Sequence, residues 1–124
     1  MTRTASLVLM AAAAIATAKT LQVKDLPPAV QKVVQEQTKG AEIKNISKEK
    51  EKGVTQYEVE TLVNGKHRDF NVDDKGTLII VEEEVALDSI PAAAKSAIEK
   101  KVGTGKLGIV ETVTEGGATR YEAA

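Results

Sequence analysis

The spacing of apolar residues predicts a helix near the start of the chain. Apolar side chains recur at i, i+4, i+7 and i+8, which places them in one stripe along an α-helix. They are Leu26, Val30, Val33 and Val34. Pro27 and Pro28 suit the first turn, whose N–H groups have no helical acceptor. Gly40 can adopt a positive φ and is expected to end the helix.

After Gly40 the pattern becomes that of β-strands. Ile43 and Ile46 are three residues apart, so the first strand departs from clean alternation and is expected to contain a bulge. The charged run 48–53 ends in glycine and predicts a hairpin tip. Residues 54–63 then alternate between apolar and polar. One face of that strand holds Tyr57, Val59 and Thr61.

Two further strands follow. Asn64-Gly65 is a strong hairpin signal, because a type I′ turn needs positive φ at both central residues. The return strand carries Arg68, Phe70 and Val72 on one face. A turn at 73–76 leads to a fourth strand over 77–85, which is apolar first and acidic later. The first unit is therefore predicted to be one helix followed by four antiparallel strands.

A second unit repeats this order. A segment of 33 residues beginning at Leu26 recurs 64 positions later, beginning at Ile90, with no gap. Identical residues coincide: Pro27 with Pro91, Ala29 with Ala93, Gly53 with Gly117, Thr55 with Thr119, Tyr57 with Tyr121 and Glu58 with Glu122. A fixed offset across a helix-like and a strand-like stretch indicates one supersecondary unit used twice.

The second copy is shorter than the first. Its helix repeats the apolar stripe, at Ile90, Ala94, Ala97 and Ile98. A strand over 107–113 follows, Gly116-Gly117 forms the hairpin tip, and 120–122 begins the next strand. By the 64-residue offset, a complete copy would continue for about 30 residues past Ala124. We favour truncation over an edge supplied by another molecule. If Ala124 is the true end, self-association or an exposed strand edge is expected.

The predicted fold class is α+β, with tandem helix-plus-antiparallel-sheet repeats of which the second is incomplete. The expected divisions are a signal peptide at 1–18, a first repeat at 19–89 and a truncated second repeat at 90–124, a helix plus about two strands. Arg3, the apolar core at 7–15 and the site Ala16-Thr17-Ala18 indicate the signal peptide. The apolar run, about 14 residues, is shorter than the roughly 20 that a membrane-spanning helix needs. An exported chain with no stable membrane anchor after cleavage, periplasmic or extracellular, is expected.

Composition narrows the class of partner. Cleavage removes Arg3 and leaves 16 basic and 18 acidic residues, a formal charge of −2. A nucleic-acid surface needs clustered positive charge, so nucleic acid is not an expected partner. The chain has no cysteine and cannot form disulfides. With two tyrosines and one phenylalanine, its core must consist mainly of Val, Ile, Leu and Ala.

The order of motifs resembles PepSY-like domains, and more narrowly the beta-lactamase-inhibitor-like group of PepSY-like exported proteins. In the first copy the matching residues are Leu26, Pro27, Ala29, Val30, Val34, Ile43, Ile46, Tyr57-Glu58-Val59-Glu60, Asn64-Gly65-Lys66, Val72-Asp73 and Gly76-Thr77-Leu78. In the second they are Ile90, Pro91, Ala93, Ile98, Leu107, Val110 and Tyr121-Glu122. The match covers nearly all of the chain after residue 18.

The resemblance implies an exported bacterial protein whose helices pack on one face of an antiparallel sheet. Related domains accompany secreted peptidases as propeptides or occur in envelope proteins, and they bind or restrain other proteins. The beta-lactamase inhibitor protein itself is longer and carries disulfides, whereas this chain has no cysteine and an incomplete second repeat. No inhibitory residue is therefore carried across.

The sequence offers no catalytic constellation. The serines after residue 18 are Ser47, Ser89 and Ser96, none in a nucleophile-elbow context. His67 is the single histidine and is expected on the surface of a hairpin. Gly103-Thr104-Gly105-Lys106 lacks the spacing of a phosphate-binding loop. Neither a catalytic residue nor a cofactor is expected.

Two acidic segments are weak candidates for cation binding. They comprise Asp73, Asp74, Glu82, Glu83 and Glu84. The full spacing of a calcium loop is absent, so the first pair is better explained as turn chemistry. The three glutamates are better explained as a solvated strand that discourages sheet-to-sheet association.

Two functions follow as hypotheses. The first is a non-enzymatic module that presents its sheet to another exported protein, such as a secreted peptidase, and inhibits or restrains it. The alternative is a small-ligand or cation-binding periplasmic protein that uses the acidic turn and strand end.

Overall fold

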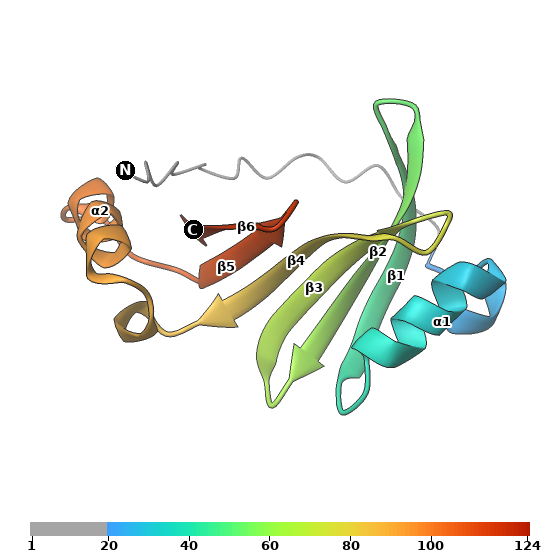
Figure 1. The fold of residues 1–124 in the computed structure, drawn as a ribbon. Coiled ribbons are helices and arrows are strands. Elements are labelled where there is room, and N and C mark those ends of the chain that lie inside the picture. The colour runs from blue at the N-terminus through green and yellow to red at the C-terminus, as the bar shows by residue number, and fades with distance from the viewer. Residues whose placement is uncertain (1–19) are drawn as a thin grey trace.

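Six strands form one antiparallel sheet, in which strands consecutive in sequence are neighbours in space (Figure 1). The structure is a computed structural model and describes residues 20–124; the predicted signal peptide lies outside them. The elements are η1 (Val23–Asp25), α1 (Pro28–Gln37), β1 (Glu42–Glu51), β2 (Val54–Val63), β3 (Lys66–Asp73), β4 (Leu78–Val85), η2 (Leu87–Ser89), α2 (Ala92–Val102), β5 (Val110–Glu115) and β6 (Ala118–Ala123). The α+β class and the antiparallel sheet are confirmed, whereas the division into two repeats remains a prediction.

Both helices pack on the same face of the sheet, which we call the helix face. Val59 on β2 pairs with Phe70 on β3, and Phe70 pairs with Val81 on β4. Because side chains alternate along a strand, Val85 lies on the face of Val81, and Val85 pairs with Val110 on β5. The core that includes α1 and the core that includes α2 are thus on one side of the sheet. Figure 1 shows the two helices toward opposite ends of that sheet.

The first core unites α1 with β1–β3. The predicted stripe is confirmed at its centre, because Val30 and Val34 are fully buried against the sheet. Their buried neighbours on the strands are Ile46, Tyr57, Val59, Phe70 and Val72. Full burial of one such side chain stabilises the fold by about 1.5–3 kcal/mol.

The second core is smaller. Ile90, Ala94 and Ile98 of the α2 segment are buried with Val110 of β5, and Tyr121 packs against them. Tyr121 is partly buried at the border of this core. Ala94 supplies less apolar area than Val30 or Val34 of α1, whereas Ile98 supplies more.

The strand boundaries differ from the prediction in two places. The charged run at 48–53 is not a loop: β1 continues through Glu51, and only Lys52 (φ 50°) and Gly53 (φ 79°) form the tip. The pairing of this run with β2 overrides its weak strand propensity. In the second half, residues 107–109 precede the strand, which begins at Val110. The bulge predicted in β1 is confirmed by a register shift between Ile43 and Asn45.

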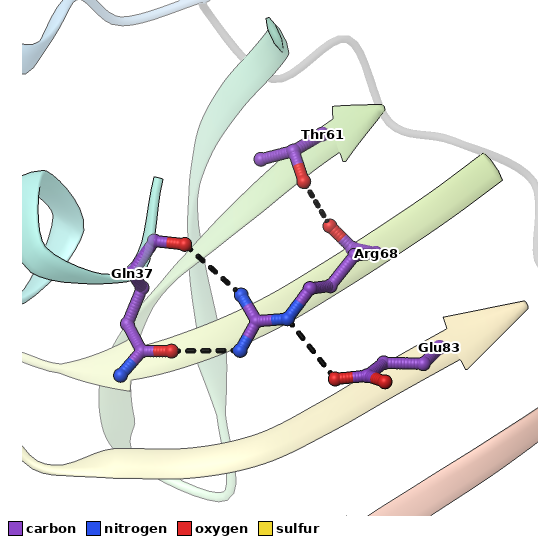
Figure 2. Close-up of polar contacts among 4 residues, drawn as sticks. All are labelled: Gln37, Thr61, Arg68 and Glu83. Carbon is purple, nitrogen blue, oxygen red and sulfur yellow. Dashed lines mark hydrogen bonds and ion pairs between the residues drawn. The ribbon is translucent and has the colours of Figure 1, made fainter. Parts of the chain in front are cut away.

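Arg68 ties the end of α1 to the sheet (Figure 2). Its guanidinium donates to the backbone carbonyl of Gln37 (3.1 Å) and to the Gln37 side-chain Oε1 (2.7 Å). Its Nε donates to Glu83 at 3.1 Å, and the group lies 5.7 Å from the centroid of the Phe70 ring. Arg68 therefore satisfies one of the carbonyls that every helix C-terminus leaves unpaired.

Candidate binding face of the sheet

The face opposite the helices, which we call the open face, is lined mainly by acidic side chains. The pairing registers place Glu58 of β2 beside Ser47 of β1 and Asn71 of β3, and Glu82 of β4 beside Asp69 of β3 and Val113 of β5. The acidic residues of the open face include Glu49, Glu51, Glu58, Glu60, Asp69, Glu82, Glu84, Glu111, Glu115 and Glu122. Neither α1 nor α2 covers this face.

Arg120 is the basic group at the centre of the β5–β6 part of this face. Its guanidinium pairs with Glu115 at 3.0 Å and with Glu122 at 3.1 Å. By contrast, Lys48, Lys50 and Arg68 lie on the helix face by strand alternation. The sheet thus separates charge between its two sides, although the whole chain is nearly neutral.

A hollow of about 420 Å³ lies in the open face. Its lining residues are Glu51, Gln56, Glu58, Asp69, Asn71, Ile79, Ile80, Glu82, Glu115 and Arg120. Carboxyl and amide groups dominate this set, and Ile79 and Ile80 add an apolar part. Such a lining can accept several hydrogen bonds from a cationic or amide-bearing group.

Glu58 holds its proton unusually tightly. Partial burial, a hydrogen bond with Glu49 and the negative charges of Glu49 and Glu60 raise its pKa to about 8. Each cause disfavours the ionised carboxylate. At neutral pH this carboxyl group is therefore largely protonated.

Glu82 behaves in the same way on the other side of the hollow. Partial burial and the charges of Glu111, Glu122 and Asp69 raise its pKa to about 7, although Arg120 opposes this. Burial is also the main cause that raises the pKa of Asp69 and of Glu111. The open face is short of positive charge, so a positively charged group placed there would favour the ionised carboxylates.

Of the residues predicted for cation binding, Asp73 and Asp74 belong to the β3–β4 turn. The Asp73 carboxylate accepts hydrogen bonds from the backbone N–H groups of Lys75 (2.9 Å) and Thr77 (2.8 Å). Asp74 is exposed. This pattern is turn chemistry, as expected for an Asp ahead of a glycine.

The three glutamates of β4 lie on different faces of the sheet. Glu83 lies on the helix face and pairs with Arg68 at 3.1 Å. Glu82 and Glu84 lie on the open face, and Glu84 accepts a hydrogen bond from the backbone N–H of His67 at 2.9 Å. At about 3.3 Å per residue, Glu82 lies roughly 13 Å along the strand from Leu78, where the turn ends. The structure therefore does not bring the two acidic segments together.

The residues that dominate the open face were not singled out from the sequence. They include Glu58, Glu60, Asp69, Glu111 and Arg120. A signal was present on β2, since Gln56, Glu58 and Glu60 alternate with the buried Tyr57, Val59 and Thr61. Strand alternation shows that the residues of one strand share a face, but strand order is needed to show that the five other strands add carboxylates to the same face.

No metal-binding cluster is present within residues 20–124. No group of three or more His, Cys, Asp or Glu side chains is placed to hold a metal ion there. His67 is exposed, as expected. The Ser89 hydroxyl donates to the carbonyl of Ala86 at 2.6 Å.

The solved structures that are similar to this chain include two bacterial proteins. A BLIP-like protein from Bacteroides fragilis NCTC 9343 matches with a TM-score of 0.55 and 14% sequence identity, over 79% of this chain and 70% of that chain. A DUF2874 family protein from Bacteroides ovatus ATCC 8483 matches with a TM-score of 0.55 and 13% identity, over 80% of this chain and 71% of that chain. No model of a known protein family matches the chain, and no curated protein does.

The chain has a BLIP-like fold. The resemblance to beta-lactamase-inhibitor-like proteins inferred from the sequence is therefore confirmed at the level of the fold. At such low identity the likeness carries no residue-level role, because one fold hosts many functions. Within residues 20–124, no helix is long and apolar enough to cross a membrane.

Proposed function

We propose that this chain is an exported, non-enzymatic module that binds another exported protein through the open face of its sheet. The observation that carries the proposal is the acidic, hollowed face that neither helix covers. A sheet held rigid by helices on its other side presents its side chains without the ordering cost that a flexible loop would pay. The BLIP-like fold supports a protein-binding role.

The charge of the open face selects the chemistry of the partner. Carboxylates from all six strands face one side, and Arg120 is already shared between Glu115 and Glu122. A partner surface bearing Lys or Arg would provide the missing positive charge. Charge complementarity of this kind raises the association rate and excludes acidic partners.

The proposed consequence for the partner is restraint. A secreted peptidase or another envelope protein covered by this face would lose access to its own ligands. This role needs no catalytic group from the present chain, and none is assigned within residues 20–124.

Affinity capture tests the proposal. The tagged chain, without residues 1–18, is used as bait against the envelope and secreted fractions of its own cells, and captured proteins are identified by mass spectrometry. We expect one exported protein to recur and to be released by salt, since screening weakens contacts between exposed charges. A folded bait that recovers no recurrent protein contradicts the proposal.

A charge-matched pair of variants locates the binding surface. Glu51→Gln with Glu115→Gln removes two carboxyl groups that line the hollow. Glu36→Gln with Asp74→Asn removes two exposed carboxylates elsewhere. We expect the first pair to weaken capture of the same partner and the second to leave it unchanged. Equal loss in both pairs would show that net charge, rather than the open face, governs binding.

A further inference from the structure

The hollow in the open face has an apolar part, and a bulge in β4 creates it. The register of β4 against β3 shifts beside Ile80, so that Ile79 has no partner residue on β3. By regular strand alternation Ile79 would face the helices. Instead, Ile79 and Ile80 both line the hollow. A bulge can redirect a side chain in this way, and here it places two isoleucines side by side on an otherwise polar face.

Carboxyl groups surround the two isoleucines. Glu115 of β5 lies directly beside Ile80. Two residues along β4, Glu82 lies beside Asp69 of β3. Glu58 of β2 is two strands from Ile80 on the other side. Neighbouring strands are about 4.8 Å apart, so one long side chain resting on Ile80 can reach several of these carboxyl groups, all of which line the hollow.

The hydrogen-bond acceptors of the hollow outnumber its donors. Among the residues that line it, Arg120 is the single basic one. Its guanidinium already pairs with Glu115 and Glu122. The side-chain amide of Asn71 donates to Gln56 at 3.1 Å and not to a carboxyl group. A group that fits this hollow therefore brings positive charge and several N–H donors of its own.

An arginine side chain combines the required properties. Its guanidinium is a planar fork of N–H donors, with more donors than a lysine ammonium offers and with less tightly bound water. Its methylene stem is apolar and can lie on Ile79 and Ile80 while the charged end stays among carboxyl groups. A metal ion would make no use of the two isoleucines. At about 420 Å³, the hollow is also within the size range of sites that bind small organic groups.

We propose that the hollow binds one arginine side chain of the partner, with its guanidinium among Glu58, Asp69 and Glu82 and its methylene stem on Ile79 and Ile80. The assignment rests on the proposed function, because the arginine belongs to the protein that the open face binds. The hollow itself belongs to the present chain, so a small arginine derivative is sufficient to test it.

The first test measures binding of N-acetyl-arginine amide by the chain that serves as bait. Backbone amide shifts are followed by NMR as the derivative is added at millimolar concentrations. We expect saturable shifts that centre on the residues of the hollow. N-acetyl-lysine amide should bind several-fold more weakly, and N-acetyl-citrulline amide, which has nearly the same shape without the charge, should not bind. Equal binding of the arginine and lysine derivatives, or shifts that do not saturate, overturns the proposal.

A pair of variants tests the apolar contact. Ile80→Thr keeps a β-branched side chain and removes apolar surface from the hollow. Val54→Thr is the matched control, because Val54 is an exposed residue of β2 that does not line the hollow. We expect Ile80→Thr to weaken binding of the arginine derivative by roughly three-fold or more, since the stem loses buried area. Methylguanidine, which lacks the stem, should bind both variants alike. Equal weakening in the two variants contradicts the placement of the stem.

The dependence of binding on pH tests where the guanidinium lies. The charged groups that face Glu58 and Glu82 are, in order of strand, Glu49, Glu60, Asp69, Glu111, Glu122 and Arg120. Carboxylates outnumber the one cation, and together with partial burial they raise the pKa of both glutamates. A guanidinium beside these two groups favours their ionised forms, so binding releases protons.

The arginine derivative should therefore bind more tightly at pH about 8.5 than at pH about 6. Carboxylates of ordinary pKa are ionised at both values, so diffuse attraction to the acidic face predicts no such change. Glu58→Gln with Glu82→Gln should remove most of the pH dependence. A wild-type chain whose affinity is the same at both pH values contradicts the proposed position of the guanidinium, and this measurement needs no variant to fold.

The two proposals can fail separately. A chain that captures a recurrent exported protein but does not bind the arginine derivative keeps the proposed function and loses the arginine site. A chain that binds the derivative in the hollow but captures no protein keeps a guanidinium site and loses the proposed function.

Discussion

At the scale of single residues, Arg68 of β3 links three parts of the fold. One guanidinium meets the last turn of α1, a carboxylate on β4 and the ring of Phe70 (Figure 2). Its side chain is only 23% exposed, so these contacts are partly protected from water. Hydrogen bonds to a charged group contribute more to stability than neutral ones.

The first prediction concerns this residue. Arg68→Met keeps an apolar stem over Phe70 and removes the hydrogen bonds to Gln37 and Glu83. We expect the free energy of unfolding in urea to fall by about 1–3 kcal/mol, because the Gln37 carbonyl loses its partner. Lys44→Met is the control, since Lys44 makes an exposed ion pair with Glu42 and such pairs contribute little. Equal effects from the two substitutions would show that the link is unimportant.

At the scale of elements, the β3–β4 turn fixes how α1 sits on the sheet. Gly76 has φ 86°, and a Cβ added there would lie 2.8 Å from the backbone oxygen of Ala29, in the first turn of α1. Gly65 in the β2–β3 turn has a similar φ of 80° but nothing within 4 Å of an added Cβ. The two glycines therefore share a backbone conformation and differ in their surroundings.

This difference gives the second prediction. Gly76→Ala and Gly65→Ala both strain a left-handed backbone, which costs about 1 kcal/mol. Gly76→Ala must also displace the backbone of α1. We expect Gly76→Ala to lower the thermal unfolding midpoint clearly more than Gly65→Ala. Similar midpoints for the two variants would mean that α1 moves away from the turn at little cost.

At the scale of the whole molecule, the two faces of the sheet differ in charge, because most carboxyl groups of the strands lie on the open face. The acidic open face contains carboxyl groups whose pKa is raised above the ordinary value, to about 8 for Glu58 and about 7 for Glu82. A carboxyl group of this kind binds its proton more tightly in the folded state than in the unfolded state. Its contribution to stability is therefore largest below the unfolded pKa of 4.5 and is lost as pH rises through the folded value.

The third prediction concerns how the stability of the fold changes with pH. The thermal unfolding midpoint should rise as pH falls from about 8 to about 5, opposite to the behaviour of a protein stabilised by ionised carboxylates. Both groups are only partly buried, so solvent screening limits the size of the effect. Glu58→Gln combined with Glu82→Gln should raise the midpoint at pH 8 and flatten its pH dependence. A wild-type midpoint that decreases as pH falls from about 8 to about 5 would contradict the assigned pKa directions.

Much of the local structure could be predicted from the sequence. Helical spacing identified Val30 and Val34 as buried, and alternation identified Tyr57, Val59 and Thr61. The Asn64-Gly65 turn and the bulge after Ile43 were also predicted, because positive φ and broken alternation leave direct traces in a sequence. The sequence did not predict that β1 continues through Glu51. The residues at 48–51 are charged and have low strand propensity, and they form a strand because they pair with β2.

The sequence by itself determined which residues of α1, β2 and β3 face a core, because the apolar side chains of these elements follow a single helical or strand period. Only the tertiary structure decided that carboxylates far apart in the chain, such as Glu58, Glu82 and Glu111, share one face of the sheet. Their shared position depends on strand order and on the register of each pair, which join residues distant in sequence. The same registers set the surroundings that raise their pKa values, since burial and neighbouring charge exist only once the strands are assembled.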